Sequence, residues 1–496
     1  MGSNMSRLHT NAFFGPELYS TYSPKRQYGA NFFESMGNKM IYSARVVESL
    51  LWTTSPILTY YVLTRYHLYT INDCFAYAQM IFAYLFIGYF TRFCGRHFNP
   101  LYSQFIADYS VGVEQFRKGQ MITKNSPVSF VAKPNPNLWY IEPPAHNLHG
   151  SMLKIWLNKI AAYCCVHTFG RRMLYPGSLC ILKTLLFQHV CQNRLKLILE
   201  MNGERWQIQS TDGNIIDGIL FNRREPFPDA PLIICCDGNG GFYETGILKT
   251  PAEMNYSVLG FNPPGFSEST GAPHAPEVSK KRTLFCLVGR IGGFPATWAA
   301  ANYPNIRGII LDASFDHVLP LAQATMPNFA SEVVETAIYS YFNLDVAGQL
   351  EKYNGPVRIV RRYNDEVVTS YHGPNELRRR RENRGNYLLL RFLKGRYPDV
   401  MRTEEDDNAV FNYLEISGFG EERHAVDESG NSLQGYDLDF VLENSDLRQH
   451  LIRLLCFMHF HDVQATHVTP LKTDEFILPE AVNFTDNFTG FLQSFR

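Results

Sequence analysis

The stretch LFCLVGRIGGFPATWAA, from Leu284 to Ala300, decides the fold of this chain. It begins with a short apolar run that is typical of a buried strand, and it continues into small residues that favour a helix. Gly289 and Gly292 bracket the junction, and glycines allow the sharp turn that joins a strand directly to a helix. This arrangement is that of a nucleophile elbow, in which the residue at the tip of the turn carries the attacking oxygen.

Residue 290, at the tip of that turn, is an arginine. An elbow of this kind carries a serine there, and the hydroxyl of that serine is the nucleophile. Arg290 cannot replace it, because a guanidinium group stays protonated at any physiological pH. The local pattern therefore predicts the scaffold of a hydrolase whose attacking atom is absent.

Apolar runs that alternate with helix-like segments surround the elbow. They are Leu232–Cys236, Ser257–Phe261, Leu284–Val288, Gly308–Leu311 and Val357–Val360. Continuous apolar runs separated by helices predict a mainly parallel sheet with helices on both faces. A hairpin is predicted before them, because two alternating runs flank the turn Asp212-Gly213-Asn214. The predicted fold class is α/β, with the α/β-hydrolase fold.

A site on this fold needs an oxyanion donor, a nucleophile, an acid and a histidine, in that chain order. The glycine-rich run CCDGNGGFYE, from Cys235 to Glu244, directly follows a predicted strand. Glycines there let backbone N–H groups approach a developing oxyanion, and Asn239 or Gly240 would be the donor. An ordinary strand-to-helix turn has a similar composition, so that alternative stays open.

The candidate acid is Asp365, which follows the run VRIVRRYN at the carboxyl end of a predicted strand. We expect this strand to be the next-to-last of the sheet, where the acid of such sites lies. Asp312 and Asp316 follow the preceding strand and are competing candidates. A helix N-cap is the structural alternative for each of these aspartates.

The candidate base is His467, in the loop QATHVTPL. It follows the acid in the chain, as a general base held by its second ring nitrogen does on this fold. His459 and His461 lie nearby and compete for the same role. A structural histidine without a catalytic role is the alternative for all three.

Two uncharged apolar stretches lie near the N-terminus, one between Glu48 and Arg65 and the other between Asp73 and Arg92. Each is at the lower limit of length for crossing a hydrocarbon layer of about 30 Å. Tyrosines at their ends and basic flanks favour a membrane hairpin with both flanks in the cytosol. A pair of buried core helices is the alternative. We therefore predict an integral membrane protein whose C-terminal domain faces the cytosol.

The rest of the composition excludes several function classes. A net charge of −1 over 496 residues gives no general attraction to nucleic acid. The histidines lack the spacing of metal ligands, so we predict no metal and no organic cofactor. We expect a cytosolic N-terminal segment (1–45), a membrane hairpin (46–93), a linker with basic amphipathic helices (94–200), the α/β-hydrolase domain (201–470) and a C-terminal tail (471–496). The basic helices favour either a packed lead-in to the domain or contact with an anionic lipid surface.

Several segments together resemble group sixteen of the abhydrolase-domain-containing proteins, a family of phosphatidylserine and monoacylglycerol lipases. They are ICCDGNGGFYETG, YSVLGFNPPGFSESTGAP, IGGFPATWAA, ILDASFDHVLPLA, NRGNYLLLRFLKGRYP and ATHVTPL. The resemblance implies a serine hydrolase of an internal membrane such as the endoplasmic reticulum, which releases a fatty acid and lysophosphatidylserine without a cofactor. Asp365 and His467 match the family's acid and base, and Asn239 and Gly240 fall in its oxyanion turn. No protein partner is indicated.

The chain departs from the family at the elbow. Arg290 lies where the family carries its serine, in V-G-R-I-G-G instead of A-W-S-I-G-G. The preceding segment HAPEVSKKRTLFCLVG is too short for the helix and full strand of relatives, so the helix between the fourth and fifth strands is expected to be shortened or missing. A skipped exon, a mis-assembled sequence and a true pseudoenzyme all fit. We expect negligible ester hydrolysis; the alternative function is a non-catalytic lipid-binding or interaction module.

Overall fold

The structure is a computed structural model, and it divides the chain into two compact units. One unit contains Met1–Ser126 and Leu179–Cys191, and the other contains Pro127–Ser178 and Gln192–Arg496. The residues that the structure describes are 12–14, 29–54, 61, 64–65, 71–102, 130–131, 138–142, 151–223, 231–238, 240–271, 284–467 and 469–495.

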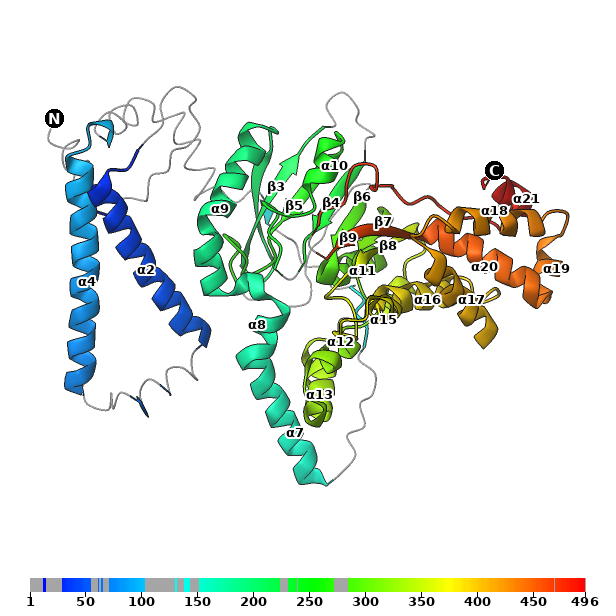
Figure 1. The fold of residues 1–496 in the computed structure, drawn as a ribbon, viewed down its shortest axis with the longest axis horizontal. Coiled ribbons are helices and arrows are strands. Elements are labelled where there is room, and N and C mark those ends of the chain that lie inside the picture. Colours follow the sequence, from blue (N-terminus) through cyan, green and yellow to red (C-terminus); the bar gives the residue numbers. More distant parts are fainter. Residues whose placement is uncertain are drawn as a thin grey trace. The chain divides into compact units, whose positions relative to one another are not determined.

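The first unit is built around two long helices, α2 (Phe32–Thr54) and α4 (Ile71–His97), which pack against each other (Figure 1). Their backbones approach closely because glycines lie at the crossing: a Cβ atom on Gly37 would stand 2.6 Å from the carbonyl oxygen of Gly88. A buried ion pair joins the two helices, in which Arg96 Nε donates to Glu34 Oε1 at 2.8 Å. The contact between helices α2 and α4 is therefore polar and hydrogen-bonded at this end.

Neither long helix meets the requirements of a membrane span. Over the residue ranges given above, no helix combines the length and the apolar character that crossing a membrane needs. This finding contradicts the predicted localisation, an integral membrane protein of the endoplasmic reticulum with its catalytic domain facing the cytosol. The first predicted stretch, between Glu48 and Arg65, lies largely outside the described residues. The second stretch, in α4, includes Gln79 and tyrosines of low hydropathy.

The second unit contains a nine-stranded sheet in the order β1-β2-β3-β5-β4-β6-β7-β8-β9 (Figure 1). Strand β3 runs antiparallel to β2 and to β5, whereas β5, β4, β6, β7, β8 and β9 are parallel. The strands are β1 (Phe130–Val131), β2 (Glu204–Gln209), β3 (Ile215–Phe221), β4 (Leu232–Cys236), β5 (Ser257–Phe261), β6 (Leu284–Gly289), β7 (Ile306–Asp312), β8 (Val357–Asn364) and β9 (Phe460–Thr466).

Parallel strands bring all their carboxyl ends to one edge of the sheet, and ligands of such sheets bind beyond that edge. We call it the carboxyl edge; it is formed by the ends of β4, β6, β7, β8 and β9. The predicted α/β class with a mainly parallel sheet is therefore confirmed. The predicted hairpin is also present, with Gly213 at the turn in the left-handed region at φ +84°.

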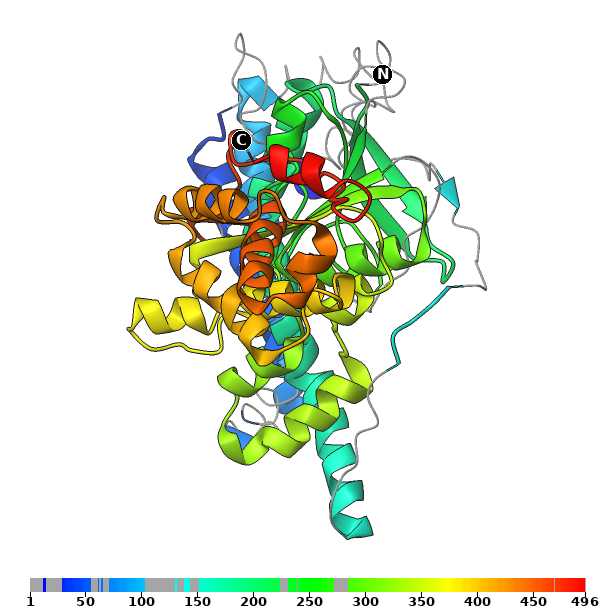
Figure 2. The same cartoon turned by 90° about the vertical axis from the view of Figure 1, so that its right-hand side faces the viewer.

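Helices flank the sheet and fill the connections between strands. An insertion after β7 contains α12, η4, α13 and α14, and Figures 1 and 2 show α13 beside α7. The helices before β7 are α7 (Met152–Cys165), the π-helical turn η1 (Val166–Gly170), α8 (Arg171–Leu174), η2 (Pro176–Ser178), α9 (Cys180–Leu199), α10 (Lys249–Glu253), η3 (Arg290–Gly292) and α11 (Gly293–Asn302). Those after β7 are α12 (Val318–Thr325), η4 (Asn328–Ala330), α13 (Ser331–Tyr341), α14 (Val346–Leu350), α15 (Glu376–Arg381), α16 (Arg384–Arg396), α17 (Glu404–Ile416), α18 (Glu422–Ser432), α19 (Leu438–Glu443), α20 (Ser445–His459) and α21 (Phe488–Gln493).

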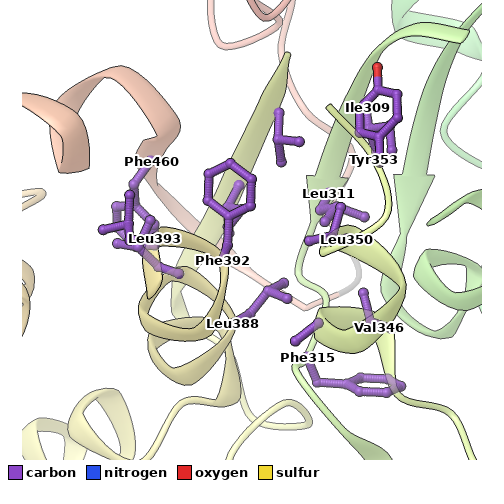
Figure 3. Close-up of a cluster of buried hydrophobic side chains, with 14 of the residues drawn as sticks. Ile309, Leu311, Phe315, Val346, Leu350, Tyr353, Leu388, Phe392, Leu393 and Phe460 are labelled. Carbon is purple, nitrogen blue, oxygen red and sulfur yellow. The ribbon is translucent and has the colours of Figure 1, made fainter. Parts of the chain in front are cut away.

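Both faces of the sheet are buried, as the continuous apolar runs require. On β7, Ile309 and Leu311 belong to one hydrophobic cluster, whereas Ile310 between them belongs to the other. Side chains of a strand alternate between its faces, so this division places one cluster on each side of the sheet. Figure 3 shows the first cluster, where Leu388 and Phe392 of α16 pack toward the strands. The two cores fix the sheet on both sides and thereby fix its carboxyl edge.

The strand before the elbow is complete. All six residues of β6 pair with β7, and Leu284 to Val288 also pair with β4. The connection from β5 to β6 contains turns over residues 262–271 and no helix there. Residues 272–283, on which the expected loss of a helix depends, lie outside the described residues, so that expectation stays a prediction.

Candidate active site

The turn after β6 has the backbone of a strand-to-helix elbow. Gly289 is the last residue of β6 and pairs with Asp312 of β7, and Arg290 then opens the single turn η3, which runs directly into α11. Arg290 thus opens a turn at the carboxyl edge, at the position in the elbow that the sequence predicted.

Two glycines let this elbow pack against its neighbours without a gap. A Cβ atom on Gly292 would lie 2.4 Å from the carbonyl oxygen of Cys236 and 2.8 Å from that of Asp237. A Cβ atom on Gly293 would lie 2.3 Å from Ser314 Oγ. Contacts that short exclude any side chain larger than hydrogen. The elbow therefore abuts the backbone at the end of β4, where the glycine-rich turn begins.

The predicted oxyanion donors occupy that glycine-rich turn. Asn239 lies outside the described residues. Gly240 is half-buried, and the turn before it is closed by the N–H of Gly241, which donates to the carbonyl oxygen of Gly238 at 3.1 Å. Backbone N–H groups in such a turn, together with the N–H of the residue after the nucleophile, form the oxyanion hole of this fold. The assignment of Asn239 and Gly240 stays a prediction.

The candidate acid and base are in direct contact at the carboxyl edge. Asp365 follows β8, His467 follows β9, and the Nδ1 atom of His467 lies 3.0 Å from both carboxylate oxygens of Asp365. Both residues are buried, with 2% and 4% of their surfaces exposed. An ionised carboxylate only accepts hydrogen bonds, so Nδ1 donates and Nε2 carries the lone pair that can take up a proton. The chemistry available to this pair is general acid–base catalysis.

Backbone contacts hold the pair in place. Asp365 Oδ1 also accepts hydrogen bonds from the N–H groups of Val367 and Val368, at 2.9 and 2.8 Å. The N–H of His467 donates to Glu366 Oε2 at 3.2 Å. No helix begins within residues 365–370, so Asp365 is not a helix N-cap. Its Oδ1 closes a turn, and both carboxylate oxygens also face the ring of His467.

The competing aspartates are bound to arginines. Asp312 accepts two hydrogen bonds from Arg362, at 2.8 and 2.5 Å, and Asp316 accepts two from Arg384, at 2.8 and 2.5 Å. Both aspartates are buried. Paired contacts of this kind neutralise a buried carboxylate and fix its orientation. Of Asp312, Asp316 and Asp365, Asp365 is the one whose carboxylate faces His467.

The competing histidines have structural surroundings. His459 Nδ1 donates to the carbonyl oxygen of Val357 at 2.8 Å, which leaves Nε2 to accept from the hydroxyl of Tyr397 at 2.7 Å. Burial lowers the pKa of His459 to about 4. Burial also lowers the pKa of His461, which is half-buried on β9. Neither contacts an aspartate at the carboxyl edge in the way that His467 does.

Arg362 is a residue near the site that sequence reasoning did not single out. It is buried in β8, binds Asp312 of β7, and donates from Nη1 to the carbonyl oxygens of Thr466 and Thr469. Those two carbonyls flank His467, so the arginine ties the loop that carries the base to the neighbouring strand. The sequence does contain a signal that could have indicated Arg362: two adjacent arginines within the apolar run VRIVRRYN. An arginine buried in a strand needs a partner for its charge.

Comparisons with known proteins agree with the family that the sequence resembles. Residues 7–120 match the model of the phosphatidylserine lipase ABHD16 N-terminal domain. An uncharacterised protein of Caenorhabditis elegans is 32% identical over 94% of this chain and 97% of its own length. The phosphatidylserine lipase ABHD16A of rat is 39% identical, over 67% of this chain and 66% of its own length. Among solved structures, the Pyrococcus furiosus esterase Pf2001 covers 34% of this chain and has 74% of its own length covered, at a TM-score of 0.27 and 12% identity, too low a likeness to carry weight.

The chain thus spans nearly the whole length of one relative and about two thirds of the length of the rat lipase. The family model covers the N-terminal part, and the relatives extend the match over most of the remaining sequence. The chain belongs to the phosphatidylserine lipase ABHD16 family.

Proposed function

We propose that this chain carries the proton-transfer half of a lipase site and lacks its nucleophile. The observation that carries the proposal is the contact between Asp365 and His467, which lie 3.0 Å apart after β8 and β9, at the same carboxyl edge as the elbow after β6 that bears Arg290. The relatives' name gives the substrate class, the acyl ester of phosphatidylserine. Monoacylglycerols are a second proposed substrate, from the family resemblance.

The mechanism follows from the geometry when a serine occupies the elbow. The serine hydroxyl attacks the ester carbonyl while His467 Nε2 accepts its proton, and Asp365 stabilises the imidazolium through Nδ1–H. Backbone N–H groups at the turn after β4 and at residue 291 stabilise the negative charge of the tetrahedral intermediate. His467 then returns the proton to the leaving alcohol, and a water molecule activated by the same histidine releases the fatty acid. No metal or organic cofactor is needed for these steps.

Arginine at position 290 removes the first of these steps. No hydroxyl is present at the elbow, so no acyl-enzyme forms there, and only the weak effect of binding and oxyanion stabilisation remains. We therefore propose that the chain with Arg290 has negligible ester hydrolysis. Two other serines near the edge are engaged elsewhere: Ser269 donates to the carbonyl oxygen of Asn262 at 2.7 Å, and Ser267 accepts from Arg194 at 3.0 Å.

A second candidate function is a non-catalytic lipid-binding or interaction module. The observation that favours it is Arg290 itself, because it leaves the fold and the acid–base pair without a nucleophile. In this second function the chain binds phosphatidylserine without turnover, and restoring the serine adds no activity. The two candidates therefore differ in one measurable result.

The test is the release of lysophosphatidylserine from phosphatidylserine vesicles by the full chain and by its Arg290→Ser variant. We expect a gain of roughly 1,000-fold or more in the variant, because the proposed acid and base are already in contact. The matched control is Arg290→Ala, which removes the guanidinium and supplies no hydroxyl, and it should stay inactive. An Arg290→Ser variant that folds but gains nothing over Arg290→Ala would favour the non-catalytic module.

A further inference from the structure

On helix α7, the apolar side chains of one face are largely exposed. Met152 is 83% exposed, Leu153 is 65% exposed and Trp156 is 60% exposed. Leu157, Ile160 and Tyr163 are also exposed, and together these six residues form what we call the α7 face. Exposed apolar patches of contiguous side chains mark interaction surfaces. We therefore expect the α7 face to bind a partner.

The opposite face of the same helix is bound to the protein. Ala162 is fully buried, and Glu332 of α13 accepts hydrogen bonds from Lys154 Nζ at 2.9 Å and from Asn158 Nδ2 at 3.0 Å. Tyr163, at the end of the α7 face, also contacts α13: its ring and that of Tyr341 meet edge to face, with centroids 6.3 Å apart. These contacts hold α7 along α13, and Figures 1 and 2 show the two helices side by side.

The charges around the α7 face indicate the chemistry of the partner. Successive helical residues are rotated by about 100°, which places Lys159 at one margin of the α7 face and Lys154, which is bonded to Glu332, just beyond the other margin. Residues 151–178 contain lysines and arginines but neither aspartate nor glutamate. Apolar side chains between marginal lysines, with a tryptophan and a tyrosine among them, are typical of a helix that lies in the plane of an anionic lipid surface.

A second copy of the chain fits the α7 face less well. A symmetric contact between two copies would bring the marginal lysines of both helices together. Glu332, the acidic residue bound to Lys154, is already engaged within its own chain. We therefore propose that the α7 face docks on an anionic lipid surface, with the helix lying in the interface and not crossing it.

The position of α7 in the fold connects this surface with the candidate site. Helix α13 belongs to the insertion that follows β7 at the carboxyl edge, where Asp365 and His467 also lie. Phe329, in the turn before α13, is 92% exposed and extends the apolar character of this insertion. Docking would place a lipid surface against the insertion of the catalytic edge. The inference itself needs no catalytic activity, so it stands or falls separately from the proposed function.

The test needs a signal that comes from α7, because α4 also carries exposed phenylalanines. Trp156 supplies it: its fluorescence in the full chain is obtained by subtracting the spectrum of the Trp156→Phe variant. We expect brominated phospholipids to quench this signal in vesicles of phosphatidylcholine with phosphatidylserine, and to quench it at least about tenfold less, at equal lipid, in phosphatidylcholine alone. Equal quenching in both vesicles would overturn the anionic assignment.

Substitutions on the α7 face give the matched comparison. Leu153→Asp with Leu157→Asp should weaken the Trp156 signal on anionic vesicles by at least about tenfold, because a charged face no longer enters the interface. Leu377→Asp with Phe440→Asp is the control: it makes the same charge change at two residues that are 65% and 52% exposed on α15 and α19. Absence of quenching in the parent chain, or equal loss in both double variants, would overturn the proposal. A concentration-dependent dimer that Leu153→Asp dissolves, without a vesicle signal, would assign the face to a second copy instead.

Discussion

The two halves of the candidate site differ in whether they contain the side chains that the proposed chemistry needs. The acid–base half, Asp365 and His467, is buried, in contact, and held by several hydrogen bonds to its own loops. The nucleophile half has the strand, the turn and the closely packed glycines of an elbow, but an arginine at its tip. The backbone of the elbow depends on Gly292 and its neighbours, whereas its chemistry depends on the single side chain at 290.

This difference shows that the fold of a site and its reactivity have separate causes. The elbow is formed by the pairing of β6 with both neighbours and by the packing of Gly292 on the end of β4, and neither needs a serine. The acid–base pair is formed by the neighbouring ends of β8 and β9, and it does not need the elbow. Each half can therefore be altered without the other, and the following experiments use that independence.

The largest effect is expected from breaking the acid–base half in the Arg290→Ser variant. Adding Asp365→Asn should lower kcat by about 10,000-fold, because an amide in place of the carboxylate reverses the tautomer of His467. The oxygen of the amide can still accept the hydrogen bonds from Val367 and Val368, so the turn should remain folded. The measurement is the rate of ester hydrolysis by the folded double variant. A loss below about tenfold would mean that Asp365 does not orient the base.

A large effect on stability is expected from Arg362→Met, which removes the link between Asp312 and the loop of His467. A buried carboxylate that loses its partner costs about 3–5 kcal/mol, and the free energy of unfolding should fall by that amount in urea titrations. The control is Arg391→Met, whose partner Asp345 is half-buried and whose own side chain is 36% exposed; we expect a loss below about 1 kcal/mol there.

A double variant tests whether the unpaired charge of Asp312 causes the loss of stability. Adding Asp312→Leu to Arg362→Met should restore part of the lost stability, because the uncompensated charge is then gone. Equal losses in the Arg362 and Arg391 variants would show that Arg362 does not anchor the acid–base half.

A smaller effect, dependent on pH, distinguishes His459 from His467. Burial lowers the pKa of His459 to about 4, whereas an unfolded histidine titrates near 6.5. Below about pH 6.5 the unfolded chain therefore binds a proton that the folded chain does not, and stability falls as the pH decreases toward about 4. His459→Gln should remove about 2 kcal/mol of the stability loss between about pH 7 and about pH 5. The measurement is the urea midpoint at both pH values, and unchanged pH dependence in the variant would contradict this assignment.

Much of the sheet could be predicted because buried parallel strands have continuous apolar runs. Strands β4 and β5 have the predicted bounds, and β6, β7 and β8 extend the predicted runs by a few residues. Strand β9 was missed because FHDVQAT is an edge strand with polar residues at several positions, so it has no continuous apolar run. The proximity of Asp365 and His467 could be expected from chain order on this fold.

Other features could not be read from the sequence. The ion pairs of Arg361 and Arg362 join strands that are far apart in the chain, and a sequence shows a buried arginine without its partner. The exposed face of α7 has the same composition as a packed helix, and only its position on α13 shows which side is covered. The predicted integral-membrane localisation was wrong, because the second uncharged stretch, which is rich in tyrosine, is less apolar than its lack of charge indicates.

The central claim is that Asp365 and His467 form a working acid–base pair beside an elbow that needs only a serine. Fluorophosphonate labelling followed by mass spectrometry of the labelled peptide tests it most directly, in the full chain, in Arg290→Ser, and in Arg290→Ser combined with His467→Ala. We expect a label at position 290 in the single variant alone, and none in the parent chain or the double variant. Labelling of any serine in the parent chain that His467→Ala abolishes, or no label in a folded Arg290→Ser variant, would contradict the account.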